Sequence, residues 1–195
     1  MKLYAITVLL LVTDAFGQTQ VTADTMGKGN DAMFISSNAL VVKDYGTLTV
    51  TTLQYWRGLT NRVDAFAGIT LTTAFGQQQA SVTGGANINL LKTKLVSVSA
   101  FNTLATPLHR RQDASAATWF AAGVVSHDFH VATLYTGYSA TVPIGHTADK
   151  LFTPPSVVHN VPVGIAIPKG KLLVFVEYNF GKAVQTAGLG VAYTF

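Results

Sequence analysis

The sequence predicts an all-β chain that closes into an antiparallel transmembrane barrel, and three observations lead to this fold class. Only 11% of the 195 residues are Asp, Glu, Lys or Arg, against about 25% in soluble proteins, so charges are too few for a hydrated exterior. No apolar run in the sequence approaches the ~18–20 residues that a membrane helix requires. Instead, segments of alternating apolar and small polar residues recur, and strands can cross a bilayer only as a closed barrel.

The N-terminal residues favour export of the chain. Lys2 is followed by the apolar run Leu3–Val12 and then by Ala15-Phe16-Gly17, which is the order of a secretory signal peptide with its cleavage site. We therefore expect residues 1–17 to be a signal peptide, residues 18–32 a polar periplasmic tail, and residues 33–195 the barrel. The chain has no cysteine, which excludes a disulfide framework and a thiol-linked lipid anchor.

Ten segments are predicted to be strands, because each is rich in β-forming residues and is bounded by turn residues. They are Met33–Val42, Thr47–Leu59, Val63–Phe75, Gln79–Leu91, Lys94–Thr106, Ala117–Ser126, Phe129–Val142, Val161–Ile167, Lys171–Phe180 and Ala183–Phe195. Most have the length of a tilted membrane strand, about 9–11 residues. The eighth segment is short, and a barrel of eight strands remains an alternative.

The connections between these segments alternate in length. With an even number of strands and a periplasmic C-terminus, every second connection is periplasmic. The connections of this set are all short: Thr60-Asn61-Arg62, Lys92-Thr93, His127-Asp128 and Pro168-Lys169-Gly170. The other set contains two long stretches, Pro107–Ala116 and Pro143–Asn160, which we expect to be extracellular loops.

The last segment carries a second, independent signal. In Ala187–Phe195, the apolar residues Leu189, Val191, Tyr193 and Phe195 share one face, and the chain ends on the aromatic ring. This pattern resembles the closing strand of bacterial outer-membrane β-barrels, a broad superfamily that includes small porin-like proteins. The resemblance implies location in the outer membrane of a Gram-negative bacterium. It also implies that these four residues are the signal read by the barrel-insertion machinery.

The two faces of the predicted strands differ in chemistry. Ser81, Thr83, Asn87 and Asn89 alternate with Val82, Ala86, Ile88 and Leu90. Pairing the last two strands about Gly181-Lys182 places Val174 opposite Leu189 and Glu177 opposite Thr186, so the apolar faces of neighbouring strands agree. We assign the apolar face to lipid and the small polar face to the lumen. A soluble barrel would invert this assignment.

The polar candidates for the lumen are few. Pairing the second and third strands about Thr60-Asn61 places Arg57 across from Asp64, where the two could shape the field of a pore or only fix the hairpin register. Glu177 and Asn179 also face the lumen, where a carboxylate could set a preference for cations. The full set of predicted lumen residues is Arg57, Asp64, Ser81, Thr83, Asn87, Asn89, Glu177 and Asn179.

No complete catalytic site can be found in the sequence. The string His127-Asp128-Phe129-His130 is superficially similar to an element of outer-membrane proteases called omptins, but it falls at a periplasmic turn and lacks the second acidic pair. His159-Asn160 invites comparison with outer-membrane lipid A deacylases, yet the required serine position is occupied by Val161. We expect no enzyme activity, no metal and no cofactor.

The sequence therefore favours a narrow, porin-like channel or passive transporter for small solutes. The alternative is a closed barrel that acts as a structural or surface-interaction protein through its extracellular loops, and a lipid- or peptide-acting enzyme is a third possibility. The expected partners are outer-membrane lipids and lipopolysaccharide, whose phosphates His109-Arg110-Arg111 could contact. The net charge of +4 gives no indication of nucleic-acid binding.

Overall fold

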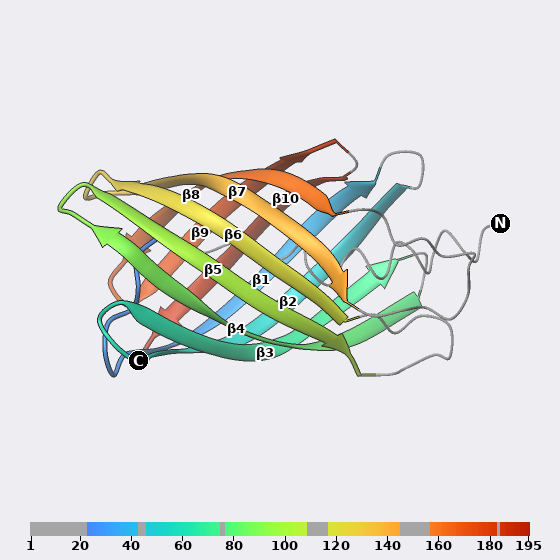
Figure 1. The fold of residues 1–195 in the computed structure, drawn as a ribbon, viewed down its shortest axis with the longest axis horizontal. Coiled ribbons are helices and arrows are strands. Elements are labelled where there is room, and N and C mark those ends of the chain that lie inside the picture. The colour runs from blue at the N-terminus through green and yellow to red at the C-terminus, as the bar shows by residue number, and fades with distance from the viewer. Residues whose placement is uncertain (1–22, 43–45, 75–76, 109–116, 145–156, 183) are drawn as a thin grey trace.

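The computed structural model describes residues 23–42, 46–74, 77–108, 117–144, 157–182 and 184–195. These form ten strands: β1 (Asp31–Val42), β2 (Gly46–Gly58), β3 (Val63–Ala74), β4 (Gln77–Lys92), β5 (Val96–Pro107), β6 (Ala117–Asp128), β7 (Thr133–Ile144), β8 (Val158–Lys169), β9 (Leu172–Gly181) and β10 (Val184–Thr194). Every strand is antiparallel to its two neighbours, and β1 pairs with β10, so the sheet closes into a barrel (Figure 1). The predicted fold class is confirmed, with ten strands and not eight.

The strand boundaries differ from the sequence prediction mainly at the turns. β7 begins at Thr133 and not at Phe129, because the N–H of Phe129 donates to the carbonyl oxygen of Ala132 at 2.9 Å and the chain turns there. β1 begins at Asp31, so the predicted tail ends at Asn30. The predicted signal peptide lies outside the described residues.

The two ends of the barrel are different. Four short turns, at residues 59–62, 93–95, 129–132 and 170–171, lie at one end, which we call the turn side (Figure 1). The other end, the loop side, carries the remaining connections. Among them are the stretches 108–116 and 145–157, which lie almost wholly outside the described residues.

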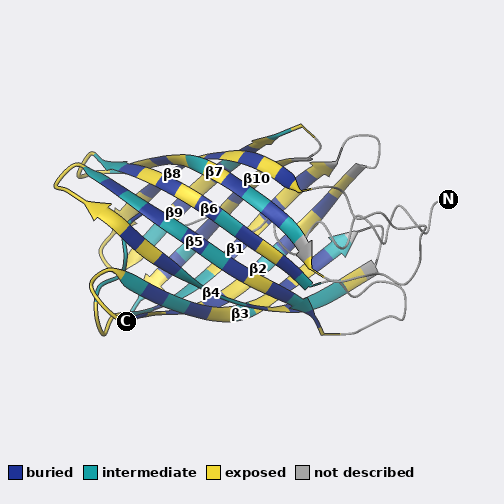
Figure 2. Cartoon of the chain, viewed as in Figure 1, coloured by how far each residue is buried: buried dark blue, intermediate teal, exposed yellow. Residues whose placement is uncertain are grey.

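Side chains alternate between the interior and the outer wall along every strand, as Figure 2 shows by the regular change of colour. The outer wall carries most of the large apolar side chains, including Ile35, Leu53, Ile69, Val125 and Leu189, which are between 39% and 61% exposed. An exposed apolar surface of this extent is typical of contact with lipid. No helix among the described residues is long and apolar enough to cross a membrane.

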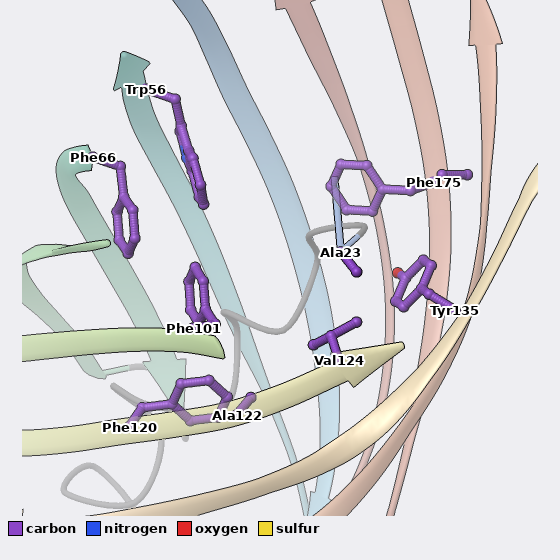
Figure 3. Packing of buried hydrophobic residues seen from close by; sticks show 10 residues of the cluster. Ala23, Trp56, Phe66, Phe101, Phe120, Ala122, Val124, Tyr135 and Phe175 are labelled. Carbon is purple, nitrogen blue, oxygen red and sulfur yellow. The ribbon is translucent and has the colours of Figure 1, made fainter. Parts of the chain in front are cut away.

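The interior contains an apolar core as well as polar groups. Seven inward-facing rings follow one another around the wall, and we call them the inner aromatic belt: Tyr135, Phe175, Phe34, Trp56, Phe66, Phe101 and Phe120. Figure 3 shows most of these rings pointing from the strands toward the middle of the barrel. The pattern of apolar residues in the sequence does not predict this belt.

Candidate functional site in the barrel interior

Seven of the eight predicted lumen residues are buried inside the barrel. They are Asp64, Ser81, Thr83, Asn87, Asn89, Glu177 and Asn179, and none is more than 3% exposed. The predicted insertion signal lies on the outer wall, with Leu189, Tyr193 and Phe195 between 41% and 62% exposed and Val191 partly buried.

Arg57 lies on the outer wall, so its predicted position in the lumen is wrong. Its side chain is 57% exposed, and its Nη1 atom is 3.8 Å from Oδ1 of Asp31 on β1. The turn between β2 and β3 explains the difference, because residues 59–62 place Gly58 opposite Asp64. A shift of one residue moves every side chain of a strand to the other face.

The register of the last hairpin also differs from the prediction, but by two residues. Val176 pairs with Leu189, and Glu177 lies opposite Gly188 and not opposite Thr186. Because the side-chain period of a strand is two, this shift leaves each residue on its predicted face.

Asp64 binds a neighbouring segment of the chain and not an arginine. Its two carboxylate oxygens accept hydrogen bonds from the backbone N–H of Met26, at 3.2 and 3.1 Å. Met26 also packs against the apolar core. The contact therefore joins β3 to the residues that precede β1.

These residues, Ala23–Asn30, fold into the turn side of the barrel, and we call them the inner segment. Ala23 is completely buried and belongs to the apolar core; it lies beside Phe175 and Tyr135 in Figure 3. The segment therefore occupies part of the space that the inner aromatic belt surrounds.

β4 holds the inner segment through two amide side chains. The Nδ2 atom of Asn89 donates to the carbonyl oxygen of Ala23 at 2.7 Å, and that of Asn87 donates to the carbonyl oxygen of Asp24 at 3.5 Å. Both were predicted to face the lumen, and the structure brings both to the same short segment.

The side chain of Asp24 makes further contacts with the wall. Its Oδ1 atom accepts a hydrogen bond from Oγ of Ser97 at 2.6 Å and lies 3.1 Å from Nζ of Lys92. A pocket of about 560 Å³ adjoins these groups at the turn side. Its lining residues are Asp24, Lys92, Thr93, Lys94, Leu95, Ser97, Ser126 and Asp128.

The link between the inner segment and β1 depends on glycine. Gly27 and Gly29 have φ angles of 82° and 83°, a region that side chains disfavour. The resulting turn is tied to β2 by hydrogen bonds of 2.8 Å from Gly29 N to Gly58 O and from Gly58 N to Asn30 O. A Cβ atom on Gly58 would collide with the carbonyl group of Gly27, so the close approach requires glycine there.

The rings of the belt form a nearly continuous series. Neighbouring ring centroids are 6.4 Å apart for Phe175 and Phe34, 5.0 Å for Phe34 and Trp56, 4.3 Å for Trp56 and Phe66, 5.1 Å for Phe66 and Phe101, and 5.9 Å for Phe101 and Phe120. Such separations are favourable for aromatic pairs. The belt is therefore a packed layer inside the wall.

Three strands contribute glycine to the belt in place of a ring. A Cβ atom on Gly85 of β4 would meet Phe66, one on Gly164 of β8 would meet Tyr135, and one on Gly190 of β10 would meet Phe175. Each ring therefore lies over the glycine of the adjacent strand. Inward glycines next to strands with inward aromatic residues are the sequence signal that could have revealed the belt.

Glu177 lies near this layer, on the opposite side of Gly164 from Tyr135. The three residues are in register across β7, β8 and β9. The Oε1 atom of Glu177 accepts a hydrogen bond from Nδ2 of Asn179 at 2.7 Å. Glu177 and Asp64 are the two charged residues among the buried side chains of the described ranges.

The loop side of the interior is lined by small polar groups. The side-chain oxygens of seven buried residues make no hydrogen bond within the described part of the chain: Ser81, Thr83, Thr103, Thr118, Thr141, Asn160 and Thr186. Each lies in the half of its strand nearer the loop side. Buried polar groups normally have a hydrogen-bond partner, and water is the partner when protein supplies none.

An apolar patch interrupts this polar lining on β1 and β2. Leu40, Leu48 and Val50 face inward and are at most 2% exposed, whereas Thr47 and Thr49 face outward. Along this part of β2 the apolar side chains face the interior and the threonines face outward, opposite to most other strands. This reversal obscured the positions of Trp56 and Arg57.

The enzyme-like strings of the sequence lie at a turn and on the outer wall where they are described. Oδ1 of Asp128 accepts a hydrogen bond from the N–H of His130 at 2.7 Å, and His130 has a φ angle of 70°, so the two form a turn. His159 lies on the outer wall, where Nδ1 is 2.6 Å from the hydroxyl of Tyr138. The described residues contain no cluster of three potential metal ligands.

Comparison with known proteins identifies the fold and no family. No protein-family model and no curated protein matches the sequence. Among solved structures, an outer membrane channel from Pseudomonas putida F1 is 11% identical, with a TM-score of 0.54; the match covers 89% of this chain and 98% of the channel. This chain therefore shares a closed β-barrel fold with a bacterial outer membrane channel.

Two further structures are similar at lower scores. The KdgM porin in complex with oligogalacturonate is 12% identical, with a TM-score of 0.45 over 84% of this chain and 99% of the porin. The attachment invasion locus protein of Yersinia pestis is also 12% identical, with a TM-score of 0.30 over 86% of this chain and 99% of that protein.

Proposed function

We propose that the protein is a narrow channel of the bacterial outer membrane, which passes small solutes through the interior of the barrel. The observation that carries this proposal is the group of buried hydroxyl and amide oxygens on the loop side. These oxygens need water, and a hydrated lining is what a polar solute would follow into the barrel. The carboxylate of Glu177 would favour cations over anions along that path.

The orientation and partners belong to the same proposal. The turn side would face the periplasm and the loop side the cell exterior, with the outer wall in contact with outer-membrane lipids and lipopolysaccharide. The insertion machinery would read the last strand through Leu189, Val191, Tyr193 and Phe195. We propose no catalytic activity.

Single-channel recording of the folded protein in a planar bilayer tests this function. We expect reproducible conductance steps, which become smaller when Thr83 and Thr103 are both replaced by valine. The substitution Thr49→Val, which makes the same change on the outer wall, should leave the steps unaltered. Glu177→Gln should lower the preference for cations.

A silent bilayer would contradict the channel if folding is verified. The protein should therefore also be recorded as the Asp64→Ala variant, in which the inner segment has lost an anchor. Absence of steps from both proteins, each shown to be folded by a heat-dependent shift on a gel, would reject the proposal.

The second candidate is a closed barrel that acts through its loops. It is favoured by the inner aromatic belt, because the interior of a small barrel can be filled by its own side chains. Under this alternative the unmodified protein and the Asp64→Ala variant would both fold and would both show no conductance in the bilayer.

A further inference from the structure

We infer that the turn-side mouth of the barrel is a binding site for the inner segment, and that this segment is a displaceable plug of the channel. The inference rests on the proposed channel function and concerns its regulation. The segment is enclosed by the apolar core, but most of the contacts that hold it are polar.

The inner segment is enclosed at the level of the inner aromatic belt. Ala23 is fully buried in the core that includes the aromatic belt, and Met26 packs against the same core. A solute that crossed the barrel would have to pass this level. The segment and the belt together therefore close the lumen near the turn side.

The contacts that hold the segment are mostly polar and local. Five wall residues bind its first four residues: Asn89 binds Ala23, Asp64 binds Met26, and Asn87, Ser97 and Lys92 all bind Asp24. No residue of Ala23–Asn30 belongs to a strand of the barrel. Residues 23–26 can consequently leave the mouth without breaking the pairing between strands, while Gly29 and Asn30 stay bonded to Gly58 of β2.

The mouth also offers water a route to these contacts. The pocket of about 560 Å³ is lined by both ends of the pair formed by Asp24 and Lys92, whose side chains are 36% and 54% exposed. An exposed ion pair adds little stability. The carboxylate of Asp64 is 1% exposed, so water competes less for its hydrogen bonds with Met26 than for those of Asp24.

A reversible cross-link tests whether the segment must move for conduction. The chain has no native cysteine, so the pair Asp24→Cys and Ser97→Cys introduces the sole thiols, at side chains that are in contact. We expect few or no conductance steps after oxidation and full recovery after reduction. The two single-cysteine variants are the controls and should not respond to the oxidant.

A second measurement follows the segment without relying on conduction. A cysteine introduced by Met26→Cys should react slowly with a water-soluble maleimide in the folded protein. Asp64→Ala should accelerate the reaction about tenfold, because loss of a charge-assisted bond shifts the population of the displaced state by that order. Asp64→Asn, which retains an acceptor oxygen, should have a smaller effect.

The matched control is Asp31→Ala, which removes a carboxylate that directly follows the inner segment but pairs with Arg57 on the outer wall. It should leave the labelling rate of Met26→Cys unchanged. Equal rates in all variants would overturn the inference, as would conductance that is the same in the oxidised and reduced forms of the cross-linked protein.

The two measurements separate failure of the plug from failure of the channel. Faster labelling with a silent bilayer would support a displaceable segment and contradict the channel. Conductance steps that ignore a verified cross-link would support the channel and overturn the plug.

Discussion

The two halves of the barrel interior are filled in different ways. Toward the turn side, aromatic rings lie over glycines of adjacent strands and the inner segment fills the middle. Toward the loop side, short hydroxyl side chains such as Thr83 and Thr141 leave their oxygens without partners in the described chain. The first arrangement buries apolar surface and so stabilises the barrel. The second keeps the lining polar but leaves hydroxyl groups without hydrogen bonds to protein, which lowers stability.

The largest difference between the halves should appear when a side chain is truncated. Phe101→Ala removes a ring that contacts three others, and we expect a loss of about 3–5 kcal/mol in the free energy of unfolding. Thr103→Ala, at the next inward position of the same strand, should cost less than about 1 kcal/mol, because its hydroxyl makes no hydrogen bond within the described residues. Urea unfolding in detergent micelles measures both free energies, and equal losses would show that the two halves do not differ in packing.

A smaller effect is expected from filling a glycine position of the belt. Gly164→Ala should destabilise the barrel by about 1–3 kcal/mol, since the added Cβ collides with the ring of Tyr135. In a Tyr135→Ala background the same change should cost much less. The double-mutant cycle of these unfolding free energies isolates the contact, and additive losses would show that the ring does not lie over the glycine.

The smallest effect should come from Arg57, outside both halves. Its Nη1 atom is 3.8 Å from Asp31 and its side chain is 57% exposed, so Arg57→Ala should change the free energy of unfolding by less than about 1 kcal/mol. Asp64→Ala should cost about 1–3 kcal/mol, because the N–H of Met26 loses its acceptor. If Arg57→Ala were as harmful as Asp64→Ala, the register of the β2–β3 hairpin would have to be revised.

The sequence predicted the strand count and most faces because both depend on a simple periodicity. Because side chains alternate with a period of two, an error of two residues in the register leaves each side chain on its predicted face. In the last hairpin, the partner of Glu177 differs from the prediction but its face does not. In the β2–β3 hairpin the error was one residue. It moved Arg57 from the lumen to the outer wall. Because adjacent residues of a strand face opposite sides, the same error assigned Trp56 to the outer wall, although Trp56 is 1% exposed.

The inner segment could not be predicted from its own residues. A polar, aperiodic stretch such as Ala23–Asn30 carries no pattern that distinguishes a tail in solvent from one bound inside a mouth. The groups that bind it, among them Asn89 and Ser97, come from β4 and β5 and converge only when the barrel is closed. The belt is likewise a property of neighbouring strands, because three of its rings, Phe66, Tyr135 and Phe175, each lie over a glycine of the adjacent strand.

The seam between β1 and β10 gives the protein an obligatory order of assembly. Ala32 pairs with Thr194, near opposite ends of the chain, so the wall is incomplete until the final strand has been delivered. Until then Phe175 lacks the neighbouring Gly190, and Ala23 has no enclosed space to enter. A chain interrupted before β10 would therefore leave the wall open and would expose the ring of Phe175, which Gly190 otherwise covers.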